Sequence, residues 1–367
     1  MNNNAPLLPP YPRATIRLQF SAAFTFSAAA ELVPDLARMG FSHVYASPIL
    51  EARAGSTHGY DIVNHNQLNR EFGGEKEFGD LVAALHHHSM GLIIDFIPNH
   101  MGVGYSDNSW WLNVLEWGQH SPYSEFFDID WNSSEQTLKG KVLVPVLGEP
   151  YGGILESGQL QLALDRTRGS FSVHYYEHRF PIHPRDYAVL LHHCMEELPP
   201  EEPLREDISQ LSASFQNLRA GRNASAQAVV IQRGEELKRA LAALIASAPP
   251  VGDSLDRVCT AWNGTANLPR SFDHLHKLLE RQAYRLAYWR LAANEINYRR
   301  FFDINDLAAV RMERAEVFEI THQLVLRLVN EGAIQGIRLD HVDGLLDPKQ
   351  YLQRVQESAA YRLIGRD

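Results

Sequence analysis

The stretch Gly336-Ile337-Arg338-Leu339-Asp340-His341-Val342-Asp343-Gly344 has the pattern of a short apolar strand followed by polar residues. It places an arginine, a carboxylate and a histidine at the carboxyl end of the strand, where catalytic side chains lie in barrels of alternating strands and helices. Arg338 and Asp340 share one face, because residues i and i+2 of a strand point to the same side. A neighbouring guanidinium keeps a carboxylate ionised, so Asp340 is a candidate nucleophile. A strand-end ion pair is the alternative interpretation.

A second strand with polar residues at its end precedes this one in the chain. Residues 92–97 form an apolar run that contains one carboxylate, Asp95, which is typical of a strand buried on both faces. Asn99 and His100 follow the strand, and they would lie beside Asp340 if the two strands are neighbours. Carboxylates, Asn and His all hydrogen-bond sugar hydroxyls, so the cluster fits a neutral alcohol substrate. The alternative is that Asn99 and His100 only cap the next element.

The first hundred residues alternate between strand-like and helix-like patterns. Expected elements are a strand at 14–20, a helix from an N-cap at Ser27 to Gly40, a strand at 43–47, a helix at 75–90 and the strand at 92–97. This order predicts parallel strands. His86, His87 and His88 close the second helix, where a favourable helix C-terminus explains them better than a metal site does.

The loop after the second expected strand contains His58-Gly59-Tyr60-Asp61. Tyr60 could stack on a sugar ring, and His58 and Asp61 could bind its hydroxyls. Taken alone, the stretch is only a turn that contains a tyrosine.

The alternation stops after about residue 100 and returns near Asp306. Strand-like pieces at 126–129, 142–147, 160–164 and 171–176 predict an antiparallel meander. Two helices are expected within 205–247, a stop at Pro249-Pro250, and a helix over 271–297. A helix carrying Val317 and Leu328 and closed by Gly332, the strand at 335–340 and a helix from Pro348 complete the chain.

These patterns predict an α/β fold in which a parallel sheet is interrupted after its third strand. The expected divisions are 1–100, an inserted subdomain at 101–300 that mixes helices and strands, and 301–367 with the fourth strand. An interruption of this length indicates an inserted domain rather than a loop.

Composition excludes several classes of function. The net charge of -10 argues against a nucleic-acid-binding surface. The two cysteines, Cys194 and Cys259, match no metal or disulfide spacing, which fits a reducing cytoplasm. The N-terminal residues do not resemble a signal peptide, and no apolar run reaches the ~20 residues of a membrane helix, so we expect a cytoplasmic protein without a membrane partner. No phosphate-binding loop, dinucleotide fingerprint or serine-hydrolase elbow is present, and no cofactor is expected.

Taken together, the motifs resemble a known family. Residues 95–100 (Asp-Phe-Ile-Pro-Asn-His) and 336–341 (Gly-Ile-Arg-Leu-Asp-His) resemble the first and second conserved regions of the α-amylase clan of retaining glycosidases. Five further stretches resemble maltooligosyltrehalose synthases, which are (1→4)-α-D-glucan 1-α-D-glucosylmutases: 17–19, 47–50, 55–61, 123–131 and 297–303. The resemblance extends over nearly the whole chain from the neighbourhood of Pro12 onward.

The resemblance implies the N-terminal half of a (β/α)8 TIM barrel, strands 1–4, with a large insertion after strand 3. It implies an intramolecular transglucosylation that converts the reducing-end α-1,4 bond of a maltooligosaccharide, an α-1,4-glucan, to an α,α-1,1 bond. Asp340 corresponds to the nucleophile and Arg338 to its charge partner. Residues expected to bind substrate are His58, Tyr60, Asp61, Asp95, Asn99, His100 and His341. No metal ligand set, including one for calcium, is indicated.

One feature of the family is missing from the pattern. Its general acid glutamate follows the next barrel strand, and this chain reaches Asp367 about where that strand would begin. Glu357 lies in the helix expected after Asp340, so we do not expect it to substitute. The sequence therefore predicts an N-terminal portion that is inactive without a C-terminal half. Alternatives are a maltooligosaccharide-binding fragment without chemistry, and a related hydrolase or glucanotransferase of the same clan.

Overall fold

A computed structural model describes residues 11–199, 204–221, 223–266 and 268–364. The residues on which the expectation of no signal peptide rests, 1–10, lie outside this part of the chain. The chain divides into two compact units. Unit 1 is made of residues 1–103 and 300–367, and unit 2 of residues 104–299.

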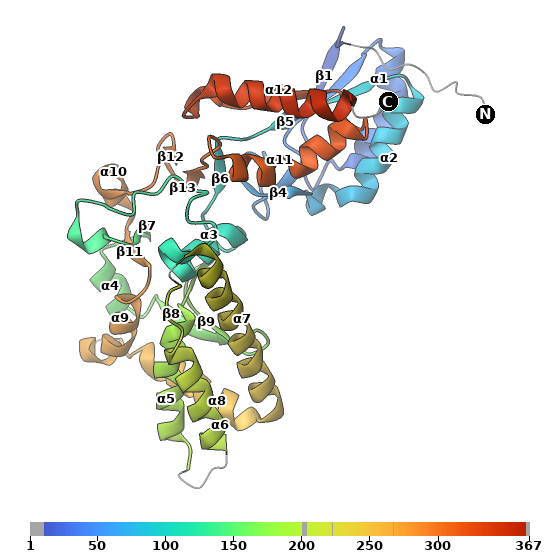
Figure 1. The fold of residues 1–367 in the computed structure, drawn as a ribbon. Helices are drawn as coiled ribbons and strands as arrows, with labels where there is room; N and C mark the ends of the chain where they lie inside the picture. The colour runs from blue at the N-terminus through green and yellow to red at the C-terminus, as the bar shows by residue number, and fades with distance from the viewer. Residues whose placement is uncertain (1–10, 200–203, 222, 267, 365–367) are drawn as a thin grey trace. The chain divides into compact units, whose positions relative to one another are not determined.

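Unit 1 is built around a four-stranded parallel sheet (Figure 1). In spatial order its strands are β1 (Thr15–Leu18), β2 (His43–Ala46), β5 (Gly91–Phe96) and β14 (Gly336–Leu339). All three pairings are parallel, which confirms the predicted parallel arrangement of four strands. The strand that ends at Asp95 and the strand that carries Arg338 are neighbours, as the placement of Asn99 and His100 beside Asp340 requires.

Four long helices belong to unit 1. They are α1 (Phe26–Arg38), α2 (Gly74–His87), α11 (Ala315–Asn330) and α12 (Pro348–Ile364). The expected N-cap at Ser27 is wrong: Thr25 caps α1, and its hydroxyl accepts a hydrogen bond from the Ala28 amide. Gly332 follows α11 with φ +74°, which confirms the left-handed position expected there.

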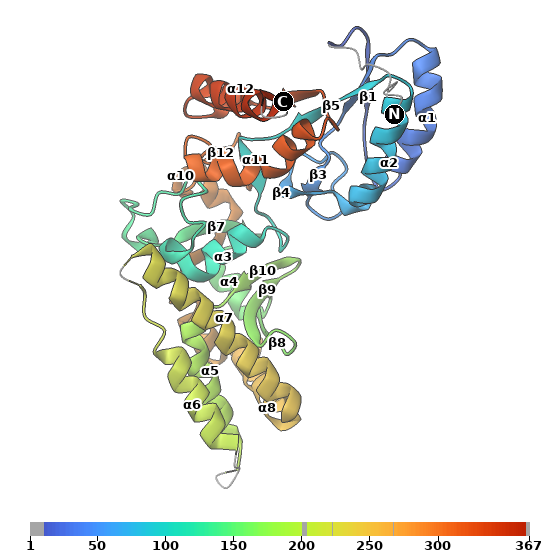
Figure 2. The same cartoon turned by 45° about the vertical axis from the view of Figure 1, so that its right-hand side comes forward.

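The core of unit 1 is formed by side chains of the central strands and of α1, α2 and α11. Helices α1 and α2 lie side by side in both ribbon views (Figures 1 and 2). Phe26 is the centre of an aromatic group, with ring centroids 4.9 Å from Phe20, 5.4 Å from Phe78 and 6.0 Å from Phe72. Edge-to-face contacts of this kind add to the hydrophobic burial of the rings. The core therefore holds the strands from one side and leaves their polar carboxyl ends free to form a site.

Short strands of unit 1 are absent from the sequence-based prediction. They are β3 (Leu50–Ala52), β4 (Ile62–Leu68), β6 (His100–Gly102), β12 (Arg300–Phe301) and β13 (Ile304–Ala309), with 3-10 turns at Arg70–Phe72 and Val342–Gly344. β3 pairs with β4, and β13 lies between β12 and β6, all antiparallel. His100 pairs with Ala309 in this second sheet, so the chain enters unit 2 after β6 and returns through β12, and these two strands flank β13.

Unit 2 combines helices with short strands. Its helices are α3 (Ser109–Trp117), α4 (Tyr151–Glu156), α5 (Tyr187–Glu197), α6 (Leu204–Gln216), α7 (Ala224–Ser247), α8 (Pro249–Trp262), α9 (Asp273–Leu279) and α10 (Ala292–Glu295). Its strands are β7 (Val142–Leu147), β8 (Gln161–Asp165), β9 (Ser170–Tyr175), β10 (His178–Pro181) and β11 (Tyr284–Tyr288). Its 3-10 turns are Gly118–His120, Gln136–Leu138, Pro184–Asp186, Pro269–Phe272 and Trp289–Leu291.

The predicted meander in unit 2 is correct only in part. β8, β9 and β10 form an antiparallel sheet, but β7 lies outside it and pairs parallel with β11. Residues 126–129 form no strand and contribute one isolated bridge, between Ile129 and Tyr298. The expected partner of β7 was the next strand along the chain, whereas the partner that buries it comes from a distant segment.

Two helix predictions in unit 2 are wrong. Residues 271–297 do not form one helix; they contain α9, β11 and α10, because the alternation of Tyr284, Leu286 and Tyr288 fits a strand paired with β7. Pro249 and Pro250 do not end the helical unit but begin α8. Proline is tolerated in the first turn of a helix, where its missing N–H has no partner to lose. Within the described residues, none of the helices combines the length and apolar character that crossing a bilayer requires.

Acid is expected to destabilise the protein through buried neutral histidines. Burial lowers the pKa of His65 and His100 to about 4 and that of His322 to about 3, against 6.5 in an exposed histidine. The unfolded chain therefore binds more protons below pH 6.5, and stability is full above that pH and falls as the pH drops toward 4. The lowered pKa corresponds to at most about 3 kcal/mol each for His65 and His100 and at most about 5 kcal/mol for His322.

Urea unfolding followed by circular dichroism at pH 7, 5.5 and 4.5 measures this effect. His322→Gln should flatten the dependence, whereas His192→Gln, which removes a histidine that is 65% exposed, should leave it unchanged. Equal unfolding midpoints at the three pH values would contradict the expectation.

Candidate active site

Polar side chains from all four parallel strands of unit 1 lie on one face of the sheet. Arg17 of β1 pairs in register with Tyr45 of β2, and Tyr45 pairs with Ile93 of β5. Asp95 lies two residues beyond Ile93, on the same face, and pairs with Arg338 of β14. The register alone therefore gathers these four side chains at the carboxyl ends of the strands.

Asp95 is the hub of this cluster. Its side chain is fully buried, with 0% exposure. One carboxylate oxygen accepts a hydrogen bond from Arg338 Nη1 at 2.8 Å. The other accepts from the hydroxyls of Tyr60 at 2.7 Å and Tyr45 at 3.0 Å, and lies 3.5 Å from Arg17 Nη1. A buried carboxylate of this kind is stable only because charged and polar donors surround it.

Arg338 joins the hub to Asp340. The same Nη1 donates to Asp95 and, at 2.5 Å, to Asp340 Oδ1. These hydrogen bonds, the one to Asp95 first, raise the pKa of Arg338 further, so the guanidinium stays charged. The Asp340 amide donates to the Phe96 carbonyl at 2.9 Å, which fixes the backbone of Asp340 against the end of β5. The Asp340 side chain is 16% exposed and remains accessible to a small substrate atom.

Two tyrosines remain protonated donors to Asp95. Burial, and then the hydrogen bond to Asp95, raises the pKa of both Tyr45 and Tyr60 above the ordinary value of 10. Arg17 lies over the Tyr45 ring at 4.7 Å and donates to the Tyr60 hydroxyl at 3.1 Å. The floor of the site is thus one hydrogen-bond network in which Asp95 accepts from Arg338, Tyr45 and Tyr60, and the Tyr60 hydroxyl also accepts from Arg17.

Histidine and phenylalanine rings form the other side of the site. His100 Nε2 lies 3.1 Å from the Tyr60 carbonyl oxygen, and burial lowers the pKa of His100 to about 4, so it is neutral at pH 7. Phe301 lies between two histidines, with ring centroids 4.0 Å from His100 and 4.8 Å from His341. Phe302 lies 5.0 Å from His341 and is 71% exposed.

His341 and Asn99 border the turn that follows β14. His341 has a left-handed backbone, with φ +49°, an uncommon conformation for a residue other than glycine. A Cβ atom on Gly344 would lie 2.5 Å from the His341 ring and 3.0 Å from Asn99 Oδ1, so only glycine fits there without a shift. Asn99 is buried, and its carbonyl oxygen accepts a hydrogen bond from the Val310 amide. The turn places both side chains beside the end of β14.

The structure brings most, but not all, of the predicted site residues together. Asp95, Arg338, Asp340, Tyr60 and His100 form one connected network, and His341 joins it through Phe301. Asp61 instead holds its own loop: it accepts from the Ser56 hydroxyl at 2.5 Å and lies 3.7 Å from Arg53 Nε.

His58 also serves mainly its own loop. Its Nδ1 accepts a hydrogen bond from the Tyr60 amide at 3.0 Å, and its side chain is 55% exposed. It therefore positions the backbone of Tyr60 rather than joining the network around Asp95.

Sequence reasoning missed Arg17, Tyr45 and Phe301 as members of the site. Arg17 and Tyr45 are large polar or amphipathic residues on short strands, and their alternation identifies a shared face only once the register is known. Glu357, the glutamate that follows Asp340 in the sequence, is exposed on α12. Among the described residues, no group of three or more His, Cys, Asp or Glu side chains is arranged to hold a metal ion.

Comparisons with known proteins show which proteins this chain is similar to. The alpha-amylase catalytic domain model matches residues 30–179. A protein of Mycobacterium tuberculosis described as a putative maltooligosyl trehalose synthase is 32% identical over 335 residues, which cover 91% of this chain and 31% of that protein.

Solved structures of the same kind of protein share the fold. The maltooligosyltrehalose synthase from Arthrobacter ramosus is 33% identical with a TM-score of 0.64, covering 95% of this chain and 34% of its own. The hypothetical maltooligosyl trehalose synthase from Sulfolobus tokodaii is 26% identical with a TM-score of 0.61, covering 95% and 34%. The chain is therefore similar over nearly its whole length to maltooligosyltrehalose synthases, carries a match to the alpha-amylase catalytic domain, and spans about a third of the length of the relatives it matches.

Proposed function

We propose that this chain provides the nucleophile of a retaining intramolecular glucosyl transfer. In the proposed reaction, Asp340 attacks the anomeric carbon at the reducing-end α-1,4 bond of a maltooligosaccharide, and the leaving oxygen takes a proton from a carboxylic acid. The glucose stays bound and attacks the glycosyl ester through its anomeric hydroxyl, whose proton returns to that carboxylate. The ester bond breaks, Asp340 is freed, and an α,α-1,1 bond results. The observation that carries the proposal is the single guanidinium nitrogen of Arg338 that bridges buried Asp95 and partly exposed Asp340.

The residues around this bridge have distinct proposed roles. Arg338 holds the Asp340 carboxylate in position, because a charge-assisted hydrogen bond is short and directional. Asp95 keeps Arg338 in place from within the sheet, and the hydroxyl of Tyr60 donates a hydrogen bond to Asp95. His100, neutral at pH 7, and His341 are proposed to hydrogen-bond sugar hydroxyls, with Asn99 beside them.

Four parallel strands of this kind correspond, in our proposal, to the first four strands of a (β/α)8 barrel. A retaining mechanism also needs a carboxylic acid about 5–5.5 Å from the nucleophile to protonate the leaving oxygen. We assign that role to no residue of this chain, and we propose that the acid is supplied by a further part of the barrel. We also propose that the chain acts in the cytoplasm on α-1,4-glucans.

An activated donor tests the nucleophile without requiring the acid. Fluoride leaves a glycosyl fluoride with little need of protonation, so incubation with α-maltosyl fluoride should glycosylate Asp340, in the peptide that contains it, and release fluoride ion. Mass spectrometry and a fluoride electrode measure the two products. Asp340→Asn should give neither, whereas Asp343→Asn, which changes an 84% exposed carboxylate three residues away, should behave as the parent chain does.

The outcomes separate the parts of the proposal. Fluoride release or an adduct that Asp340→Asn does not abolish would overturn the assignment of the nucleophile. With unactivated maltopentaose, the chain alone should release neither glucose nor a nonreducing product. Turnover of maltopentaose that requires Asp340 would instead show that this chain contains its own acid.

A further inference from the structure

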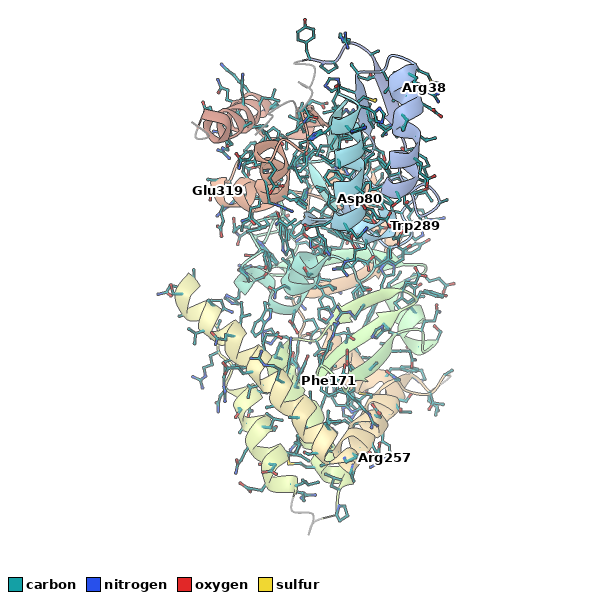
Figure 3. The ribbon with its side chains drawn as sticks, turned by 90° about the vertical axis from the view of Figure 1, so that its right-hand side faces the viewer. Arg38, Asp80, Phe171, Arg257, Trp289 and Glu319 are labelled. Atoms are coloured by element: carbon teal, nitrogen blue, oxygen red, sulfur yellow. The ribbon has the colours of Figure 1, made fainter. Side chains whose placement is uncertain are left out.

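Unit 2 contains a hollow that is lined by none of the residues of the candidate active site. It has a volume of about 430 Å³. Its walls come from the start of α3, the turn between β8 and β9, the strand β10 and the middle of α7; Phe171 of β9, labelled in Figure 3, lies in its wall. This volume is in the range of small-molecule sites in proteins.

The turn between β8 and β9 is held firmly against α7. Asp165 Oδ1 accepts hydrogen bonds from the amides of Thr167 and Arg168, both at 3.0 Å. Gly169 has φ +58°, and a Cβ atom there would lie 2.1 Å from the Lys238 carbonyl oxygen of α7. The backbone of the turn therefore contacts α7 directly. This contact fixes the backbone position of Arg168, which lines the hollow.

One cation in the hollow is already neutralised. Lys238 Nζ donates to Glu116 and to Glu235, each at 2.6 Å, and the Lys238 side chain is only 9% exposed. Glu116 is buried and Glu235 is 49% exposed, and the charges of the two carboxylates and the lysine sum to one negative charge. Its carboxylate oxygens retain lone pairs that can accept hydrogen bonds from hydroxyl groups.

The arginines of the hollow are not neutralised in this way. Arg179 of β10 is half-buried, and within the described part of the chain its guanidinium makes no ion pair or hydrogen bond. Burial lowers the pKa of Arg179, and so does repulsion from Arg168, whereas attraction to Glu116 and Asp165 raises it. Arg168 and Arg179 both line the hollow. Arg239 of α7 adds a third cation, and Arg168 has only a 3.7 Å contact with Asp165.

Such an arrangement stabilises a bound anion. Two guanidinium groups that repel each other in a hollow are both satisfied by one anion with several acceptor oxygens, and arginine binds phosphate through paired parallel hydrogen bonds. The hollow is larger than inorganic phosphate needs, and its remaining polar lining includes Ser109, Asn113, Ser170 and the two carboxylates on Lys238. These groups suit hydroxyls. We propose that the hollow binds a sugar phosphate, with the phosphate between Arg168 and Arg179.

Isothermal titration calorimetry tests the proposal. The whole chain is titrated separately with glucose 6-phosphate, inorganic phosphate and glucose. Glucose 6-phosphate should bind most tightly, inorganic phosphate more weakly, and glucose not measurably. Arg179→Gln and Arg168→Gln should each weaken binding of glucose 6-phosphate by about tenfold or more, the loss expected for one charge-assisted contact. Raising the salt concentration should weaken binding further, because the contacts are ionic.

Controls distinguish a site from a general charge effect. Arg257→Gln removes one positive charge from α8 of the same unit, at a position labelled in Figure 3, and should leave the affinity unchanged. Arg168 is 70% exposed on a turn, so its variant tests the site even if Arg179→Gln lowers stability. The proposal would be overturned if glucose 6-phosphate does not bind at millimolar concentration. It would also be overturned if the Arg168 and Arg179 variants bind it as tightly as the parent chain does. Equal affinity for inorganic phosphate would overturn the sugar part of it.

This inference stands apart from the proposed glucosyl transfer. Asp340→Asn should leave glucose 6-phosphate affinity unchanged, because all residues of the hollow lie between Ser109 and Arg239 in unit 2. Loss of binding in that variant would assign the ligand to the candidate active site instead and would overturn the second site.

Discussion

Replacing Asp95 by alanine is expected to destabilise unit 1 by about 3–5 kcal/mol, the usual cost of removing one partner of a buried ion pair. The loss is large because one fully buried carboxylate accepts from Arg338, Tyr45 and Tyr60, and also neutralises Arg17. Without it, two arginines lose the carboxylate that neutralises them and the hydroxyls of two half-buried tyrosines lose their acceptor. Asp95→Asn should cost less, since the amide oxygen still accepts one hydrogen bond while the charge is lost.

Two optical probes can locate this effect. All six tryptophans lie between Trp110 and Trp289, in unit 2, so tryptophan fluorescence follows unit 2 while circular dichroism follows both units. We expect urea to produce an earlier transition in circular dichroism than in fluorescence for Asp95→Ala. Asp80→Ala, which removes an exposed carboxylate of α2 labelled in Figure 3, should change stability by no more than about 0.5 kcal/mol. A similar value for Asp95→Ala would show that the network is not structural.

The second large effect is expected from Arg338→Met in the reaction with α-maltosyl fluoride. Methionine keeps much of the side-chain volume but removes the hydrogen bond that holds Asp340 Oδ1. We expect the rate of Asp340 glycosylation to fall about 100-fold, since small misplacements of a reacting group have effects of this size. The maximal rate of glycosylation should fall, whereas the half-saturating concentration of α-maltosyl fluoride should stay unchanged.

Arg327→Met provides a matched control for this prediction. Arg327 of α11 is 45% exposed and Arg338 is 46% exposed, and both pair with two carboxylates. The control should leave the rate unchanged, and Arg338→Lys should lie between the parent chain and Arg338→Met, because lysine retains charge but not the planar fork. An unchanged rate in Arg338→Met would remove Arg338 from the proposed mechanism.

Local patterns were enough to predict the central sheet. The apolar run around Asp95 and the i, i+2 spacing of Arg338 and Asp340 depend only on strand periodicity, and the structure places both strands side by side. Arg17 and Tyr45 were missed for a different reason. Their membership in the site depends on which residues pair across strands, and register is set by tertiary packing that a single short strand does not reveal.

Unit 2 shows where local patterns fail. β7 and β11 are separated by more than a hundred residues and pair with each other. For this reason residues 271–297, predicted as one helix, contain a strand between short helices. The aromatic and β-compatible residues Tyr284, Leu286 and Tyr288 fit either structure, so the distant partner decides. Pro249-Pro250 was misread because proline both ends one helix and suits the first turn of the next.

The insertion of unit 2 also dictates an order of events as the chain is synthesised. Asp95 and Arg338 are 243 residues apart, so the last strand of the central sheet emerges only after unit 2 is complete. Unit 2 is one continuous segment and can fold first, since domains generally fold as units during synthesis. Until β14 arrives, the apolar edge of β5 and the carboxylate of Asp95 have no Arg338 to cover them. We therefore expect a folding intermediate in which unit 2 is folded while β5 is still an unpaired edge strand. An unpaired edge of this kind is prone to aggregation.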